Sequence, residues 1–147
     1  MSSPYDAGAP PSGAPGGKTS LGLESNVGAM LCYILNFVCC LGLVLSIIFV
    51  ITEKENRFVK FHAVQSLFLA ALQIAVGLVI GILGLILSLA LNAFDLAWLA
   101  WILILGLRFI LLLIFLALWI MGGIKAYGGQ WYKLPIIGEF AWKTVNK

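Results

Sequence analysis

The chain has 147 residues, of which 62% are hydrophobic and 10% are charged, and its mean hydropathy is +1.07. Soluble domains carry about a quarter charged residues, so this chain has too few polar groups to cover a soluble surface. The composition excludes a soluble enzyme, a disulfide-rich secreted scaffold and a nucleic-acid-binding domain as leading interpretations. It predicts an all-α membrane protein, with the lipid bilayer as its first partner.

Residues 1–26 differ from everything that follows. They hold four of the five prolines together with many Gly, Ser and Ala residues. Such a segment buries too little apolar surface to offset the entropy lost on ordering. We predict a flexible, disordered N-terminal tail here, followed by a transmembrane domain over 27–147. The three cysteines lie in the first apolar run of that domain and are interpreted as packing residues: Cys32, Cys39 and Cys40.

Three apolar stretches follow the tail, over residues 27–51, 63–91 and 96–124. At 1.5 Å per residue, each is long enough to cross a hydrocarbon core of about 30 Å as a helix. The sequence therefore predicts three transmembrane helices.

Two polar segments adjoin these spans. Thr52 and Glu55 have the spacing of a capping box, which predicts a helix that begins near Glu53 and continues into the second span. Residues 125–147 form a short amphipathic segment in which Pro135 is expected to open a helix. Its apolar side chains are expected on the membrane surface and its aromatic ones at headgroup level: Ile136, Ile137, Phe140, Trp131, Tyr132 and Trp142.

The cations indicate an orientation in the cell membrane. Three Lys and Arg residues lie between the first two spans and four follow the third, whereas the opposite side has only Lys18. Because cytoplasmic segments are enriched in Lys and Arg, the sequence predicts an external N-terminus and a cytoplasmic C-terminus.

Small and polar residues recur on one helical face of the second span. Lipid gives no hydrophobic drive between helices, so such a face favours close helix packing. Asn36 belongs to a similar stripe in the first span. Two interpretations stay open, namely packing among the three helices and assembly into a homo-oligomer or a larger complex. The residues of the second-span face are Gln73, Gly77, Gly81, Gly84 and Ser88.

Arg108 lies eleven to twelve residues into the third span, near the predicted membrane midplane. A charge there costs on the order of 2.5–3.5 kcal/mol on insertion scales, so it needs polar partners or water. Asn36 is the candidate partner at matching depth, and Gln73 matches less well. Arg108 is either a structural anchor or part of a transport or ligand site.

His62 is the single histidine and lies at the predicted cytoplasmic interface. One histidine without further ligands does not make a metal site. We interpret it as a structural hydrogen-bonding residue and keep it only as a weak candidate cofactor ligand. The chain contains none of the common catalytic motifs, so we predict a protein that is not an enzyme and carries no cofactor.

Two segments resemble a known family. EKENRFVKFHAVQSL (residues 53–67) and GGQWYKLPIIGEFAWK (residues 128–143) resemble two signatures of small prokaryotic membrane proteins of unknown function. That family is similar in turn to the Tic channel-type membrane component of the chloroplast inner-envelope import translocon. The matching positions are Phe58, Phe61, His62, Gln65 and Ser66 in the first segment and Lys133, Leu134, Pro135 and Gly138 in the second.

The resemblance implies a multi-helix membrane protein linked to protein translocation or to the assembly of a membrane complex. The plant relatives are described with four helices and three are predicted here, which argues against a pore formed by this chain alone. Both signatures fall on the predicted cytoplasmic face, where we expect Phe58 and Phe61 to enter the membrane while Arg57 and Lys60 meet lipid phosphates. The two segments are also expected to pack together.

The sequence therefore predicts a non-enzymatic integral membrane protein that acts as a structural, accessory or assembly subunit, with a link to translocation implied. Its partners are expected to be other membrane subunits or further copies of itself. The alternative is a small oligomeric channel or transporter component, in which Arg108, Asn36 and Gln73 line a polar path.

Overall fold

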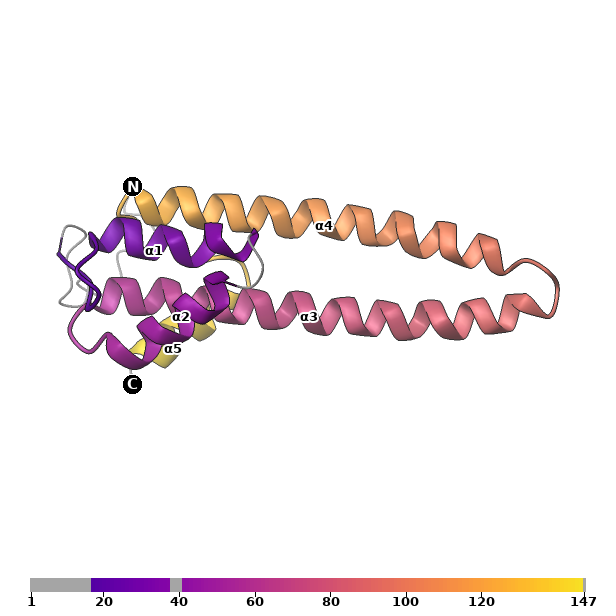
Figure 1. Cartoon of the computed structure of the whole chain (residues 1–147), viewed down its shortest axis with the longest axis horizontal. Helices are drawn as coiled ribbons and strands as arrows, with labels where there is room; N and C mark the ends of the chain where they lie inside the picture. Colours follow the sequence, from indigo (N-terminus) through magenta and orange to yellow (C-terminus); the bar gives the residue numbers. More distant parts are fainter. Residues whose placement is uncertain (1–16, 38–40, 147) are drawn as a thin grey trace, which may run out of the picture. The chain divides into compact units, whose positions relative to one another are not determined.

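The computed structural model describes residues 17–37 and 41–146, and its elements are helices (Figure 1). The prediction of an all-α protein is confirmed. The described chain divides into two compact units, which we call unit 1 (residues up to 68 and from 119) and unit 2 (residues 69–118). The elements are α1 (Ser25–Ile34), the 3₁₀ helix η1 (Leu35–Phe37), α2 (Leu41–Thr52), α3 (Arg57–Asn92), α4 (Ala97–Tyr127) and α5 (Ile137–Val145).

The first predicted span, residues 27–51, is not one helix, so this prediction is wrong. α1 and α2 lie side by side in unit 1 as the two arms of a hairpin (Figure 1). A Cβ added to Gly28, early in α1, would lie 3.3 Å from the ring of Phe49, late in α2. A Cβ on Gly42 would lie 2.5 Å from the backbone nitrogen of Asn36. With 10 and 12 residues, the arms are about 15 and 18 Å long.

Hydrogen bonds close the open end of this hairpin. The backbone N–H of Ser20 donates to the two carboxylate oxygens of Glu53, at 2.9 and 3.2 Å. The hydroxyls of Ser20 and Thr52 lie 2.9 Å apart. Residues 17–26 are thus part of unit 1, and the prediction of a flexible tail is wrong for them. The rest of that prediction concerns residues 1–16, which lie outside the described residues, as do Cys39 and Cys40.

Asn56 caps α3, and the predicted capping box of Thr52 and Glu55 is wrong. Thr52 is the last residue of α2, so it cannot also begin the next helix. The Asn56 Oδ1 atom accepts a hydrogen bond from the backbone N–H of Val59 at 3.3 Å, which satisfies one of the free donors of the first turn. The Asn56 amide also donates to the hydroxyl of Ser25 and so binds the helix start to α1.

The start of α3 forms the centre of unit 1. Nearly every side chain in its first turns is buried, as expected for a helix surrounded by other helices. Phe61 and Val64 form a hydrophobic cluster with Ala141 of α5. Ile137 of α5 is also buried, so its predicted place on the membrane surface is wrong, whereas Phe140 is 61% exposed. The buried residues of α3 in unit 1 are Phe58, Val59, Phe61, His62, Ala63, Val64, Gln65 and Ser66.

Unit 2 consists of the rest of α3 and most of α4, which run antiparallel and are joined by a turn at Asp95 (Figure 1). α3 has 36 residues and α4 has 31, so both exceed a hydrocarbon core of about 30 Å. Only 6% of the most apolar stretch of α3 and 11% of that of α4 are buried. A core helix of a soluble protein would be mostly buried. These are the two described helices that are long and apolar enough to span a membrane.

Adjacent glycines in α4 give a matched test of the packing in unit 1. A Cβ on Gly122 would lie 2.6 Å from the buried ring of Tyr33, whereas a Cβ on Gly123 would meet its nearest neighbour, Ile34, at 3.5 Å. We expect Gly122→Ala to lower the free energy of unfolding by about 1–3 kcal/mol through overpacking. Gly123→Ala should leave it unchanged or raise it by up to about 1 kcal/mol, since alanine favours helices.

Unfolding of both variants in mixed detergent micelles, followed by circular dichroism, measures the difference. Equal effects of the two substitutions would contradict the contact between Gly122 and Tyr33.

Candidate functional site

A hydrogen-bond network joins three buried side chains of unit 1. The Gln65 Nε2 atom donates to the Tyr33 hydroxyl at 2.8 Å, and this hydroxyl lies 3.1 Å from His62 Nδ1. The His62 Nε2 atom lies 3.0 Å from the carbonyl oxygen of Gln130. A carbonyl oxygen only accepts, so Nε2 carries the proton and Nδ1 accepts from Tyr33. Both ring nitrogens of His62 are therefore occupied by structural hydrogen bonds.

Gln65 also binds the backbone of the C-terminal segment. Its Nε2 atom donates to the carbonyl oxygen of Tyr132 at 3.1 Å, and its Oε1 atom accepts from the N–H of Leu134 at 3.1 Å. The side chain of Leu134 is itself buried. The segments 53–67 and 128–143, singled out in the sequence, thus pack together as expected.

Ser66 connects the same helix to both arms of the hairpin. Its hydroxyl donates to the Cys32 carbonyl at 2.8 Å, lies 3.1 Å from the Ser46 hydroxyl and accepts from the Asn36 amide at 3.3 Å. The Asn36 amide also donates to the Cys32 carbonyl at 2.7 Å. The sequence matched Asn36 to Arg108 by its depth in a continuous first span, and the break after α1 removes the basis of that match.

Aromatic rings pack around His62. The rings of Phe58 and Phe61 make T-shaped contacts with the imidazole, with centroid distances of 4.7 and 5.1 Å. Both phenylalanines are fully buried, so the expectation that they enter the membrane is wrong. The ring centroids of Trp131 and Trp142 are 5.6 Å apart, and both side chains pack against the cluster that contains Phe61. The signature aromatics thus form the interior of unit 1.

The remaining signature residues shape the turn before α5. The Lys133 ammonium lies 3.1 Å from a Glu139 carboxylate oxygen and 4.6 Å from the ring centroid of Trp142. A Cβ on Gly138 would lie 2.5 Å from the Cα of Lys133, so a residue with a side chain cannot be placed there without a backbone shift. Pro135 stands two residues before α5 and does not itself begin the helix.

The glycines of unit 2 face α4 in different ways. A Cβ on Gly81 would lie 3.0 Å from Nη2 of Arg108, so this glycine makes room for the guanidinium group. A Cβ on Gly84 would lie 3.1 Å from Ile104. The same atom on Gly77 would have no neighbour within 4 Å, which leaves open space above the backbone. Ser88 is half-buried further along α3.

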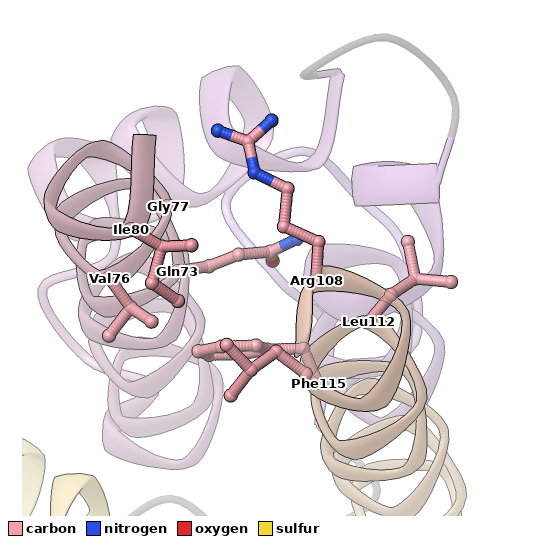
Figure 2. Close-up of a pocket in the computed structure, with 8 residues that line it drawn as sticks. Gln73, Val76, Gly77, Ile80, Arg108, Leu112 and Phe115 are labelled. Carbon is pink, nitrogen blue, oxygen red and sulfur yellow. The ribbon is translucent and has the colours of Figure 1, made fainter. Parts of the chain in front are cut away.

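Arg108 and Gln73 line one cavity of about 350 Å³ in unit 2. From the sequence, Gln73 was the poorer of two candidate partners for Arg108, because its predicted depth in the membrane differed more than that of Asn36. Figure 2 shows Gln73 extending from α3 toward α4, with the Phe115 ring between the two helices. Arg108 also borders a second cavity of about 270 Å³. Within the described chain, Arg108 has neither an ion pair nor a hydrogen bond. The first cavity is lined by Gln73, Val76, Gly77, Ile80, Arg108, Leu111, Leu112 and Phe115.

Tyr33 and Asn56 join α1 to the start of α3, and neither was expected from the sequence. Tyr33 lies in an uncharged apolar run, and a buried hydroxyl needs a hydrogen-bond partner. This hydroxyl was therefore the feature of the sequence that could have indicated a buried polar contact. Among the described residues, no group of three or more His, Cys, Asp or Glu side chains is placed to hold a metal ion.

The chain is similar to membrane proteins of archaea. A UPF0132 membrane protein of Methanocaldococcus jannaschii is 40% identical over 126 residues, which cover 85% of this chain and 92% of the relative. A second UPF0132 membrane protein of that organism is 33% identical over 125 residues, covering 83% of this chain and 71% of the relative. A UPF0132 membrane protein of Archaeoglobus fulgidus is 32% identical over 125 residues, covering 84% and 98%.

No solved structure shows a significant match to the chain. Residues 24–141 match the magnetosome magnetite crystal formation protein family, and this range includes the whole first signature segment and residues 128–141 of the second. The relatives' names and the two long apolar helices agree that the chain is a membrane protein. The chain belongs to the magnetosome magnetite crystal formation protein family, in which it resembles the UPF0132 membrane proteins.

Proposed function

We propose that this protein is a non-enzymatic structural or accessory subunit of a complex in the cell membrane. The observation that carries the proposal is the use of the signature side chains inside unit 1. The polar groups of Gln65, His62 and Ser66 form hydrogen bonds inside the protein, including bonds to backbone carbonyl oxygens. Their role in this arrangement is to hold the C-terminal segment and the hairpin around α3.

The exposed surface supports contacts with lipid and with other membrane subunits. Large apolar side chains cover the outside of both long helices, and α2 exposes a further apolar face. In lipid such surfaces associate through close packing and polar contacts, so they suit neighbouring transmembrane helices or another copy of the chain. The α2 face includes Leu41, Val44, Ile47, Ile48 and Ile51.

A translocation complex is one assembly that such a subunit fits. The support is the resemblance of residues 53–67 and 128–143 to signatures of proteins similar to the Tic component, and these two segments form the interior of unit 1. The matched family's description names magnetite crystal formation, and the relatives' names specify a membrane protein.

A second candidate function is a small oligomeric channel or transporter component. The cavity that Arg108 and Gln73 both line favours this function, because a charged and an amide side chain border one cavity inside the apolar unit. Asn36 lies in unit 1, where its amide nitrogen donates to Cys32 and Ser66, and the depth match that put it on this path assumed a continuous first span.

Purification from the native membrane in mild detergent, followed by native mass spectrometry, tests the subunit role. We expect other membrane proteins to be retained in fixed ratio with this chain. A homo-oligomer alone that conducts ions in liposomes would instead establish the channel function. A monomer that retains no other protein in several detergents and after cross-linking in the membrane would contradict both.

We further propose that both ends of the chain face the cytoplasm. The start of α1 is bound to the end of α2, and the C-terminal segment is bound to the start of α3. In the proposed topology the hairpin of α1 and α2 begins and ends on the same side of the membrane, and α3 and α4 each cross it once. The chain then crosses the membrane an even number of times. Eight of the nine Lys and Arg residues precede residue 69 or follow residue 118, and residues 92–96 contain none, which supports a cytoplasmic location. This replaces the external N-terminus predicted from three spans.

Cysteine labelling of intact cells tests this topology, in a variant that lacks the native cysteines. Single cysteines at Ser2 and Asn146 should resist a membrane-impermeant maleimide until the cells are opened, whereas a cysteine at Ala93 should be labelled from outside. Labelling of both Ser2 and Ala93, but not of Asn146, in intact cells would restore the three-span topology.

The Gln65 network generates a prediction about the C-terminal segment. Gln65→Leu leaves the N–H of Leu134 without its partner, and a buried unsatisfied group costs about 1–3 kcal/mol. We expect amide hydrogen exchange at Leu134 to accelerate at least tenfold, with little change in residues 100–118. Ser66→Ala is the matched control, because it removes a buried polar group from the neighbouring network only. Equal protection of Leu134 in Gln65→Leu and the control would contradict the proposed role.

A further inference from the structure

Arg108 has no counter-charge in its own unit. Asp95 is the one acidic residue between 69 and 118, and thirteen residues along a helix correspond to about 20 Å. The guanidinium lies above Gly81, with no ion pair or hydrogen bond from the described residues. Charged groups in a membrane are normally paired, so this cation calls for an anion from outside unit 2.

Space for such an anion lies next to the guanidinium. The cavity of about 350 Å³ is lined mainly by apolar side chains, with Arg108 and Gln73 as its polar groups. Gly77 forms an open part of its wall, because no atom would lie within 4 Å of a Cβ there. An apolar cavity of a few hundred Å³ with a small number of polar groups is typical of a site for a small molecule.

We propose that this cavity binds a long-chain fatty acid, with its carboxylate on Arg108 and its acyl chain along the wall at Gly77. A guanidinium donates two parallel hydrogen bonds to a carboxylate, which gives the site its preference for an acid. An acyl chain matches the apolar lining. A transmembrane helix of a partner is too wide for a cavity of this volume, since a helix with its side chains is about 10 Å across.

The depth of Arg108 favours a fatty acid over a phospholipid. Arg108 lies twelve residues after Leu96, which is about 18 Å along α4 and more than half of a hydrocarbon core. A phospholipid keeps its phosphate at the headgroup level, whereas a fatty acid has one chain and a small head that can sit deeper. This site is independent of the subunit role, and either proposal can fail without the other.

Binding of isotopically labelled oleate to the full-length protein in phosphatidylcholine nanodiscs tests the site, with native mass spectrometry counting the bound molecules. We expect one oleate per chain, and at least tenfold weaker binding of methyl oleate, which has the same chain but no charge. Arg108→Gln should weaken oleate binding about tenfold or more, because it removes a charge-assisted bidentate contact. Arg108→Lys should retain part of the affinity.

Two glycine variants separate loss of the site from loss of the fold. Gly77→Leu fills the cavity and should abolish oleate binding. Gly106→Leu is the matched control, because Gly106 is an equally open glycine of α4 that does not line this cavity, and it should bind oleate within about twofold of the wild type. Circular dichroism establishes the helix content of each variant.

Equal binding of oleate and methyl oleate, or unchanged binding in both Arg108→Gln and Gly77→Leu, would overturn the proposal. Displacement of oleate by an equimolar amount of phosphatidylglycerol would overturn it in favour of a phospholipid headgroup.

Discussion

The fold of this chain depends on the satisfaction of a few buried polar groups in an otherwise apolar molecule. Gln65 is the clearest case, because its amide binds a tyrosine hydroxyl, a carbonyl oxygen and a backbone N–H at once. Removal of any partner leaves a buried group without compensation, and in low-dielectric surroundings that loss is large. The network therefore fixes which segments surround α3, whereas apolar contacts alone would allow many similar arrangements.

The two long helices could be predicted from the sequence because their uncharged runs exceed a bilayer in length. The hairpin could not. Residues 27–51 contain no charge and have the length of a span, so length and hydropathy treat them as one helix. The features that bring the arms together are the Ser20–Glu53 contact and the close approach of Gly28 to Phe49. Both contacts join residues far apart in sequence, and local patterns of hydropathy do not predict such contacts.

Prediction of the site was limited in a similar way. The resemblance identified Gln65, His62 and Ser66. Several of their partners are backbone carbonyl and N–H groups, which every residue has, so the sequence does not indicate them. Expecting Phe58 in the membrane was reasonable for an aromatic beside cations at an interface, but the side chain packs on His62 instead. Arg108 was recognised as costly in lipid, whereas its place above Gly81 required the relative register of two helices.

The topology that we propose has a consequence for biogenesis. If the hairpin enters the bilayer and returns, everything before it stays on the side where the ribosome released it. The proline-rich beginning of the chain, with its Lys18 and acidic Asp6, then never has to be carried through the hydrocarbon. In the proposed topology, insertion requires that one helical pair and its short loop enter the membrane, and Asp95 is the one charged residue of that loop (residues 92–96).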